Sequence, residues 1–240
     1  MLRAKIFRMT KSNIDILYED NHIIAVNKKV GDIVQGDKTG DIPLSDLVKQ
    51  YIKEKYEKPG DVYLGVVHRI DRPVSGVVLF ARTSKAAARL SEMFRDKSIT
   101  KTYWAVVKNK PPHESGTLVH YLLKNEKKNM SRAYATEQNG ALRSELEYKI
   151  LFSGDNYTLL EVKPISGRHH QIRVQLSAIG CPIKGDLKYG SKRSNENGGI
   201  HLHARQVEFI HPTKDEKIII TADPPDEPLW NAFKKMAAGV

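Results

Sequence analysis

The residues best suited to chemistry stand close together in residues 68–76, HRIDRPVSG. Asp71 lies between Arg69 and Arg72, and nearby cations favour the ionised form of a carboxylate. An ionised carboxylate can act as a nucleophile or as a base. The same spacing fits a surface turn held by ion pairs, and on spacing alone that reading is favoured. Asp71 is therefore a candidate whose function depends on what the rest of the chain places around it.

A second polar stretch, residues 166–176 (SGRHHQIRVQL), leads into a predicted amphipathic helix. Arg168 and Arg173 bracket the start of that helix. Helix N-termini bind phosphate and carboxylate groups well. One of these arginines could hold a phosphate or pair with a distant carboxylate such as Asp71. The alternative is a solvated helix face.

Aromatic and histidine side chains offer two further possibilities. Tyr103 and Trp104 follow Lys101, and an aromatic ring beside basic residues can stack on a nucleobase, although a core aromatic is the commoner case. Four histidines could suggest a metal site: His169, His170, His201 and His203. However, no acidic motif at ligand spacing accompanies them. We expect structural or RNA-contacting histidines and no metal. No nucleotide-binding glycine motif is present, so we expect no cofactor.

The hydrophobic pattern indicates short strands joined by tight turns, with few helices between them. Strands are predicted at residues 14–18, 22–27, 77–81, 102–107, 146–152, 157–162, 201–209 and 217–221. Helices are predicted at residues 44–52, 84–94, 172–179 and 229–236. Residues 108–141 are polar and Lys-rich, with no clear pattern. This order predicts an α+β fold, a mainly antiparallel mixed sheet with flanking helices, rather than a doubly wound parallel sheet.

Composition narrows the class of protein further. The chain has 240 residues and a formal net charge of +11, which favours a polyanionic partner such as nucleic acid. Its single cysteine, Cys181, fits a reducing compartment. Because no signal peptide or membrane-spanning run is evident, we expect a cytoplasmic protein that does not contact membranes. We predict a monomer with no obligate protein partner, made of one domain over residues 14–240 after an extension over residues 1–13.

Together these segments resemble the RluA-type family of RNA pseudouridine synthases, from about Ile14 to about Pro228. Residues 27–31 (NKKVG) look like the family's first motif, with Lys29 where proline is usual. Residues 68–76 look like the central motif, with Ile70 for leucine and Val74 for threonine. The order is completed by residues 101–103 (KTY), 166–174 (SGRHHQIRV, with serine for threonine), 185–186 (GD), 189–190 (YG), 202–204 (LHA) and 211–212 (HP).

The resemblance implies an active-site cleft across the sheet and a role for each matching residue. Asp71 would be the catalytic aspartate, Tyr103 would pack against the target uracil, and Arg173 would pair with Asp71. The substrate-binding residues would be His68, which lies in the central motif, Arg69, which would help displace the nucleotide from its stack, Arg168, and the pocket-lining Ile172 and Leu176. The substrate would be rRNA or tRNA, and the isomerisation needs no cofactor.

Three other functions are possible for a chain with these residues. A non-catalytic RNA-binding protein could use the same scaffold, and a metal-dependent hydrolase could use the histidines. A glycosidase would need a second carboxylate paired with Asp71, which is not evident. Because strand-like sequence begins near Ile14, we expect no separate RNA-binding module ahead of it. The basic segments 108–141 and 185–199 are then the candidates for substrate-specific contacts.

Overall fold

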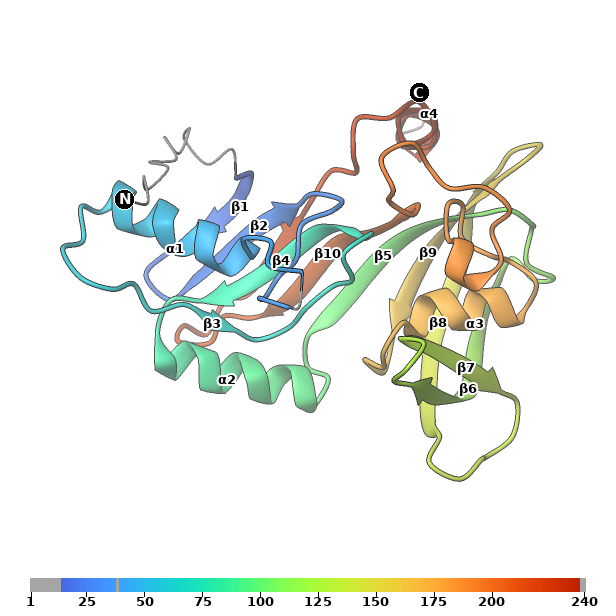
Figure 1. Cartoon of the computed structure of the whole chain (residues 1–240), viewed down its shortest axis with the longest axis horizontal. Coiled ribbons are helices and arrows are strands. Elements are labelled where there is room, and N and C mark those ends of the chain that lie inside the picture. Colours follow the sequence, from blue (N-terminus) through green and yellow to red (C-terminus); the bar gives the residue numbers. More distant parts are fainter. Residues whose placement is uncertain (1–13, 38, 238–240) are drawn as a thin grey trace, which may run out of the picture.

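The computed structural model describes residues 14–37 and 39–237, and the predicted extension over residues 1–13 lies outside this part. All strands of the described part belong to one sheet (Figure 1). The strands are β1 (Ile16–Glu19), β2 (Ile23–Lys28), β3 (Gly65–Val66), β4 (Ser75–Ala81), β5 (Thr100–Val107), β6 (Ser115–Asn125), β7 (Met130–Tyr134), β8 (Leu142–Ser153), β9 (Thr158–Pro164), β10 (Leu202–Ile210) and β11 (Lys217–Thr221). The helices are α1 (Leu44–Lys55), α2 (Ser84–Arg95), α3 (Gln171–Ala178) and α4 (Pro228–Ala237), with a 3-10 turn η1 (Leu187–Tyr189).

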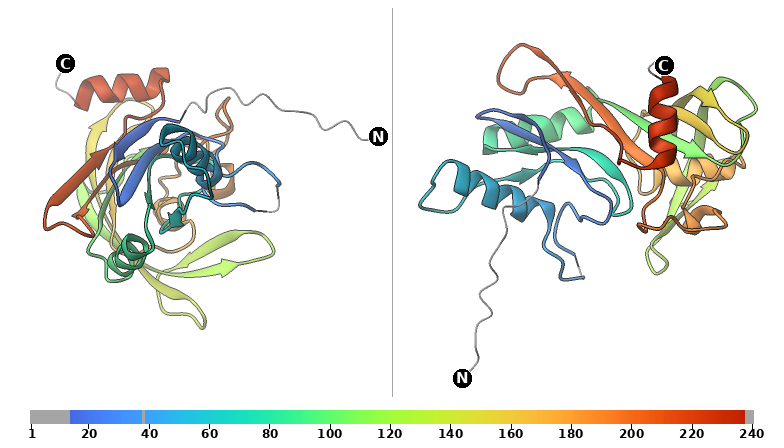
Figure 2. Two further views of the ribbon diagram at one scale, coloured as in Figure 1. Left: turned by 90° about the vertical axis from the view of Figure 1, so that its left-hand side faces the viewer. Right: turned by 90° about the horizontal axis from the view of Figure 1, so that it is seen from above.

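The strand order is β1-β2-β4-β10-β5-β9-β8-β6-β7, with β11 paired to β10 and β3 to β4. Within the described residues the pair β4–β10 is parallel, and the other neighbouring strands run antiparallel. The predicted mainly antiparallel mixed sheet with flanking helices is therefore confirmed. The parallel pair joins two halves of the sheet, which carry different helices (Figures 1 and 2).

In the first half, both faces of the sheet are covered by helices. Strand β4 is buried along its whole length, because its side chains alternate between two cores. Val78 and Phe80 pack with α1, while Val77 and Leu79 pack in a core that includes residues of α2. Helix α2 begins where Thr83 Oγ1 accepts a hydrogen bond from the Ala86 amide, 3.2 Å away, which is how a threonine caps a helix N-terminus.

In the second half, β5 separates two further cores. Ala105 and Val107 face the cluster that contains Ile172 and Leu176 of α3. Trp104 and Val106 face the opposite cluster, which holds Trp230 and Phe233 of α4. Tyr103 lies two residues from Ala105 and is packed against the α3 side. The strand alternation therefore directs Tyr103 toward the face on which α3 lies.

Residues 108–141, which sequence patterns left unassigned, contain the long strand β6 and the hairpin partner β7. Exposed and half-buried positions alternate over the first six residues of β6, but the half-buried positions include Gly116 and His120, while Val119 is exposed. The sequence therefore lacks the apolar alternation by which a half-buried strand is recognised. The hairpin projects beside α3 (Figure 1). No helix in the described part of the chain has the length and apolar character that crossing a bilayer requires.

Candidate functional site

Asp71 lies in the loop between β3 and β4, and backbone contacts hold this loop from both sides. The Asp71 carbonyl accepts a hydrogen bond from the Val74 amide at 3.0 Å, which closes a turn. The next carbonyl, that of Arg72, accepts from Gly31 at 3.0 Å, and the carbonyl of Pro73 accepts from Ile200 at 3.0 Å. The backbone around Asp71 is therefore tied to segments that lie far apart in the sequence.

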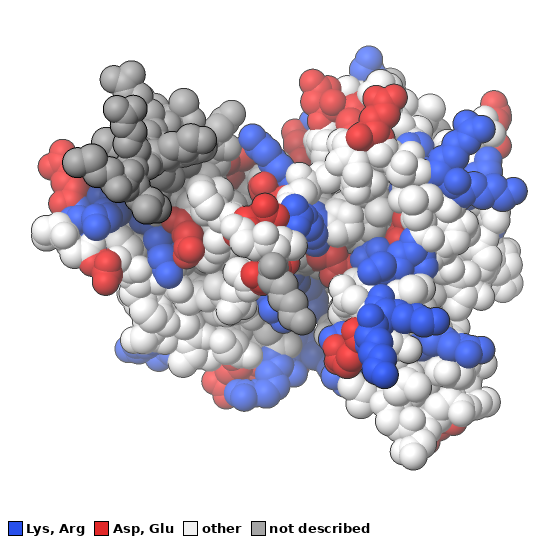
Figure 3. Space-filling model, viewed as in Figure 1, with Lys and Arg blue, Asp and Glu red and all other residues white. Residues whose placement is uncertain are grey.

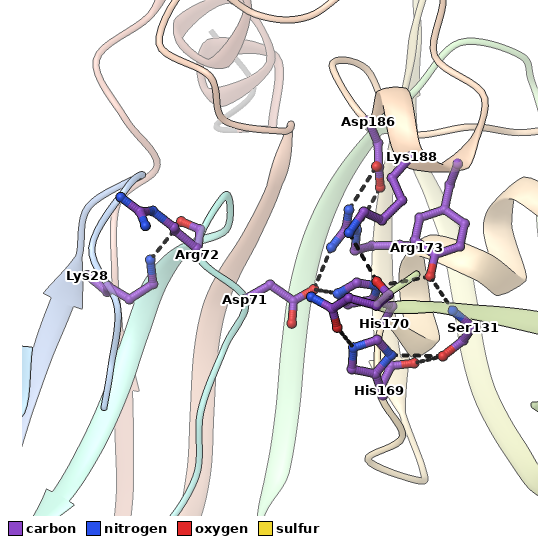
Figure 4. A network of polar contacts seen from close by, with 11 residues as sticks. Lys28, Asp71, Arg72, Ser131, His169, His170, Arg173, Asp186 and Lys188 are labelled. Carbon is purple, nitrogen blue, oxygen red and sulfur yellow. Dashed lines mark hydrogen bonds and ion pairs between the residues drawn. The ribbon is translucent and has the colours of Figure 1, made fainter. Parts of the chain in front are cut away.

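Lys28, at the end of β2, reinforces the same loop from beneath (Figure 4). Its side chain is buried, and its ammonium donates to the carbonyls of Lys29 at 2.9 Å, Asp32 at 2.8 Å and Arg72 at 3.2 Å. Burial lowers the pKa of Lys28 to about 8, although the charges of Asp32 and Asp71 oppose that shift. The three acceptors use all the donors of the ammonium group, so Lys28 joins two loops beside Asp71.

Arg173, on the first turn of α3, holds the carboxylate of Asp71. Its Nη1 donates to Asp71 Oδ2 at 2.8 Å, so the predicted pairing is present. Its Nε and Nη2 donate to the two carboxylate oxygens of Asp186 at 2.7 and 2.9 Å. Burial alone would lower the pKa of Arg173, but hydrogen bonding and charge from Asp186, then from Asp71, raise it. A permanently charged, planar fork therefore links two carboxylates rigidly.

The two oxygens of the Asp71 carboxylate have different surroundings. Oδ2 receives Arg173 and also lies 3.5 Å from His170 Nε2. In Figure 4 the second oxygen points away from these partners, and about a third of the side chain, 31%, is accessible. One oxygen is thus used for orientation while the other is open to an incoming group, as a nucleophile or base requires.

Tyr103 and Ile172 belong to the same apolar cluster on the α3 side of the sheet, and Tyr103 lies within range of the Asp71 charge. Burial raises the pKa of Tyr103, and the negative charge of Asp71 raises it further, so the phenol stays neutral. Ile172 is 7% exposed, whereas Leu176, one turn later, is fully buried in the same core. Leu176 is therefore a core residue, and the roles of Ile172 and Leu176 in lining a uracil pocket stay predictions.

Three other candidate residues in the described part of the chain, His68, Arg69 and Arg168, make no hydrogen bond or ion pair with the Asp71 carboxylate. The His68 ring stacks on Phe94 with 4.6 Å between centroids, and its Nε2 accepts from the Leu79 amide at 2.9 Å. These contacts hold the segment before Asp71, and a role for His68 in substrate binding stays a prediction. Arg69 and Arg168 are exposed. Arg168 precedes α3, where its amide donates to Gln171 Oε1 at 3.0 Å, and both arginines can reach a phosphate.

The histidines considered as metal ligands have other partners. His203 lies between Ser75 Oγ at 2.9 Å and the Ala222 carbonyl at 3.0 Å, and His201 Nδ1 lies 2.8 Å from the Asn195 side chain. Over residues 14–37 and 39–237, no group of three or more His, Cys, Asp or Glu is arranged to hold a metal ion. His203 thus ties β10 to the start of β4 and to the segment after β11, while His201 holds the loop before β10.

Sequence reasoning assigned no function to several residues that the fold brings to the site. Asp186 and Tyr189 come from the turn around η1, and Ser131 comes from β7 (Figure 4). Residues 185–186 and 189–190 did stand out as motif pairs, which was the one available signal for Asp186 and Tyr189. The contact of Ser131 with Tyr189 depends on tertiary folding and left no local trace.

The surroundings of the site are furrowed and basic. Figure 3 shows a furrow between the two halves of this face, with Lys and Arg side chains along its edges. This agrees with the predicted cleft across the sheet. A polyanion could follow such a furrow, because basic side chains at its edges neutralise phosphates.

Comparison with known proteins gives consistent matches. Residues 22–178 match the family model described as RNA pseudouridylate synthase. The ribosomal large subunit pseudouridine synthase C of Vibrio parahaemolyticus is 33% identical over 94% of this chain and 69% of its own length. The tRNA pseudouridine synthase C of the same organism is 29% identical over 89% of this chain and 92% of its own length.

Solved structures share the fold. The human RNA pseudouridylate synthase domain containing 4 superposes with a TM-score of 0.74 at 23% identity, over 94% of this chain and 92% of that one. The human RNA pseudouridylate synthase domain containing 1 gives a TM-score of 0.71 at 24% identity, over 95% and 90%. At this identity the likeness concerns the architecture of the sheet and its helices.

Proposed function

Since the chain belongs to the RNA pseudouridylate synthase family, we propose that it isomerises uridine to pseudouridine in structured RNA with Asp71 as the catalytic carboxylate. The observation that carries the proposal is the pairing of Asp71 with Arg173 at 2.8 Å. This pairing orients one oxygen and leaves the other pointing away from Arg173 and His170 (Figure 4). The reaction breaks the N1–C1′ bond of uridine, turns the uracil, and joins C5 to C1′. The hydrogen on C5 then leaves as a proton, and N1 gains a proton.

The surroundings of Asp71 suit that chemistry. A carboxylate can attack the ring, attack the sugar or take a proton from the sugar, and each use requires an ionised, oriented group. Arg173 supplies both charge and geometry. Tyr103 and Ile172 offer an aromatic and an apolar surface that can retain the detached uracil until C5 is joined to C1′. No redox change occurs, so the proposed reaction needs no cofactor.

The target nucleotide must leave its stack to reach Asp71, at a cost of a few kcal/mol. We propose that Arg69, exposed in the same loop, enters the vacated position, and that Arg168, which is also exposed, holds a phosphate. One relative is named for ribosomal large subunit RNA and another for tRNA. We propose that the substrate belongs to one of these two classes, recognised by the basic furrow.

The proposal is tested with Asp71→Asn, which keeps the side-chain size and removes the charge. We expect tritium release from C5-labelled uridine in RNA to be abolished, while RNA affinity and the unfolding midpoint stay close to wild type. Asp46→Asn makes the same chemical change on the exposed side of α1 and should leave release intact. Undiminished release by Asp71→Asn would refute the assignment. RNA binding without any release by the wild type would instead favour a non-catalytic RNA-binding protein.

A further inference from the structure

The hydroxyl of Tyr189 lies between the hairpin and the active site. It is 2.8 Å from the backbone nitrogen of Ser131 on β7 and 2.8 Å from Nδ1 of His170. On the other side of the imidazole, Nε2 lies 3.5 Å from Asp71 Oδ2. Tyr189 and His170 are both buried. A continuous line of polar atoms therefore runs from the hairpin backbone to the carboxylate proposed to react (Figure 4).

The position of each proton along this line follows from donor and acceptor counts. The Ser131 amide can only donate, so the Tyr189 oxygen accepts from it. The phenol then has one proton to give, and His170 Nδ1 is the acceptor within reach. With Nδ1 accepting, a neutral imidazole carries its proton on Nε2. This Nε2–H group is directed at Asp71 Oδ2. The other tautomer would turn a nitrogen lone pair toward a carboxylate oxygen.

The charged groups around His170 support the neutral form. Burial lowers the pKa of His170 to about 3; the charge of Asp71 opposes this shift, while Arg173, His169 and Lys188 add to it. Tyr189 is also kept neutral, because burial raises its pKa. At neutral pH the line therefore joins an uncharged phenol and an uncharged imidazole to one carboxylate.

We propose that His170 is a positioning residue that offers a neutral Nε2–H donor to Asp71 Oδ2, with its tautomer set by Tyr189. This inference rests on the proposed function. Arg173 and His170 approach the same oxygen, so together they fix the rotation of the carboxylate and leave Oδ1 to react. The 3.5 Å separation is long for a hydrogen bond, and such contacts shorten when substrate closes an active site.

A consequence is that the hairpin acts on the active site through its backbone. Ser131 also contacts His169, since its hydroxyl donates to the His169 carbonyl at 2.8 Å. Asn129, at the hairpin turn, lies 2.9 Å from His169 Nε2. Movement of β7 would remove the amide that orients the Tyr189 hydroxyl. An RNA that displaced β7 would thereby change the orientation of Asp71.

The proton assignment is tested by nitrogen NMR of the full chain labelled with ¹⁵N-histidine at pH 7. The His170 signals are identified by their loss in His170→Asn, a substitution that suits the left-handed backbone of this position (φ 53). We expect Nε2 in the protonated range and Nδ1 in the unprotonated range. A proton on Nδ1, or on both nitrogens, would overturn the inference. This measurement needs no turnover, so it separates failure of the inference from failure of the proposed function.

The positioning role is tested with Tyr189→Phe, which keeps the ring that lies 5.1 Å from the Arg173 guanidinium. We expect an Nδ1-protonated population of His170 to appear and kcat for pseudouridine formation to fall about 10-fold, with KM for RNA unchanged. Tyr18→Phe, at the far edge of the sheet, should behave as wild type. A wild-type kcat in Tyr189→Phe would overturn the role. If that variant does not fold, the wild-type NMR result still decides the tautomer on which the role depends.

Discussion

Arg173 is the side chain on which the geometry of the site depends. It uses three of its nitrogens on two carboxylates, and the pair with Asp186 is almost completely buried, at 5% and 1% exposure. Buried ion pairs of this kind add little net stability, yet removal of one partner leaves an uncompensated charge. The Asp186 carboxylate therefore matters less as a source of stability than as the group that aims the remaining Nη1 at Asp71.

At the residue scale we predict that Asp186→Ala destabilises the chain by about 3–5 kcal/mol, measured by urea unfolding at pH 7. The same variant should have a lower kcat for pseudouridine formation, because the Arg173 guanidinium is no longer held in one orientation. Glu114→Ala removes an exposed ion pair with Lys110 and should change stability by about 0–1 kcal/mol. An equal effect of the two substitutions would show that the buried pair has no special structural role.

The contact between Arg173 and Asp71 could be predicted from the sequence, whereas the rest of the constellation could not. Both residues stand in recognisable motifs and carry opposite charges. Asp186, Tyr189 and Ser131 join them only because the turn around η1 and strand β7 pack against α3. Their positions depend on tertiary packing, which local composition and spacing do not encode.

At the element scale, the parallel pairing of β4 with β10 places the Asp71 loop. His203 is opposite Ser75 and Ala204 is opposite Gly76, so the loop that ends at Ser75 lies against the start of β10. Each strand could be predicted from its own apolar pattern. Their pairing, over a separation of more than a hundred residues, could not be predicted, and neither could the exposed hairpin of β6 and β7.

The pairing of β4 with β10 should depend on Gly76, whose backbone has a positive φ of 114 degrees. A Cβ added there would lie 2.3 Å from the Ala204 carbonyl oxygen, which is backbone and cannot move aside alone. We therefore expect Gly76→Ala to cost about 2 kcal/mol or more in the free energy of unfolding. The matched change Gly60→Ala meets nothing within 4 Å and should be close to neutral. A small effect at Gly76 would mean that β4 and β10 separate easily.

At the scale of the whole molecule, Lys and Arg side chains lie along the edges of the furrow and also on other parts of the same face (Figure 3). The net charge of +11 attracts any polyanion, but affinity for a particular RNA depends on which cations contact phosphates. Lys127, Lys128 and Arg132 on the hairpin are exposed and lie near the residues that contact His169. Lys192 and Arg193, after η1, are exposed as well. These are the segments from which we expect the RNA to be held.

Net charge and local contact can be separated by two triple variants of equal charge. Replacing Lys127, Lys128 and Arg132 with glutamine should weaken RNA binding and reduce the slope of log affinity against log salt by roughly 0.7–0.9 for each lost contact. Replacing Lys53, Lys58 and Lys85, exposed on or beside α1 and α2, lowers the net charge equally but should reduce the slope much less. Fluorescence anisotropy over a salt series measures both. Equal slopes in the two variants would mean that the RNA responds to total charge and that the hairpin does not bind it.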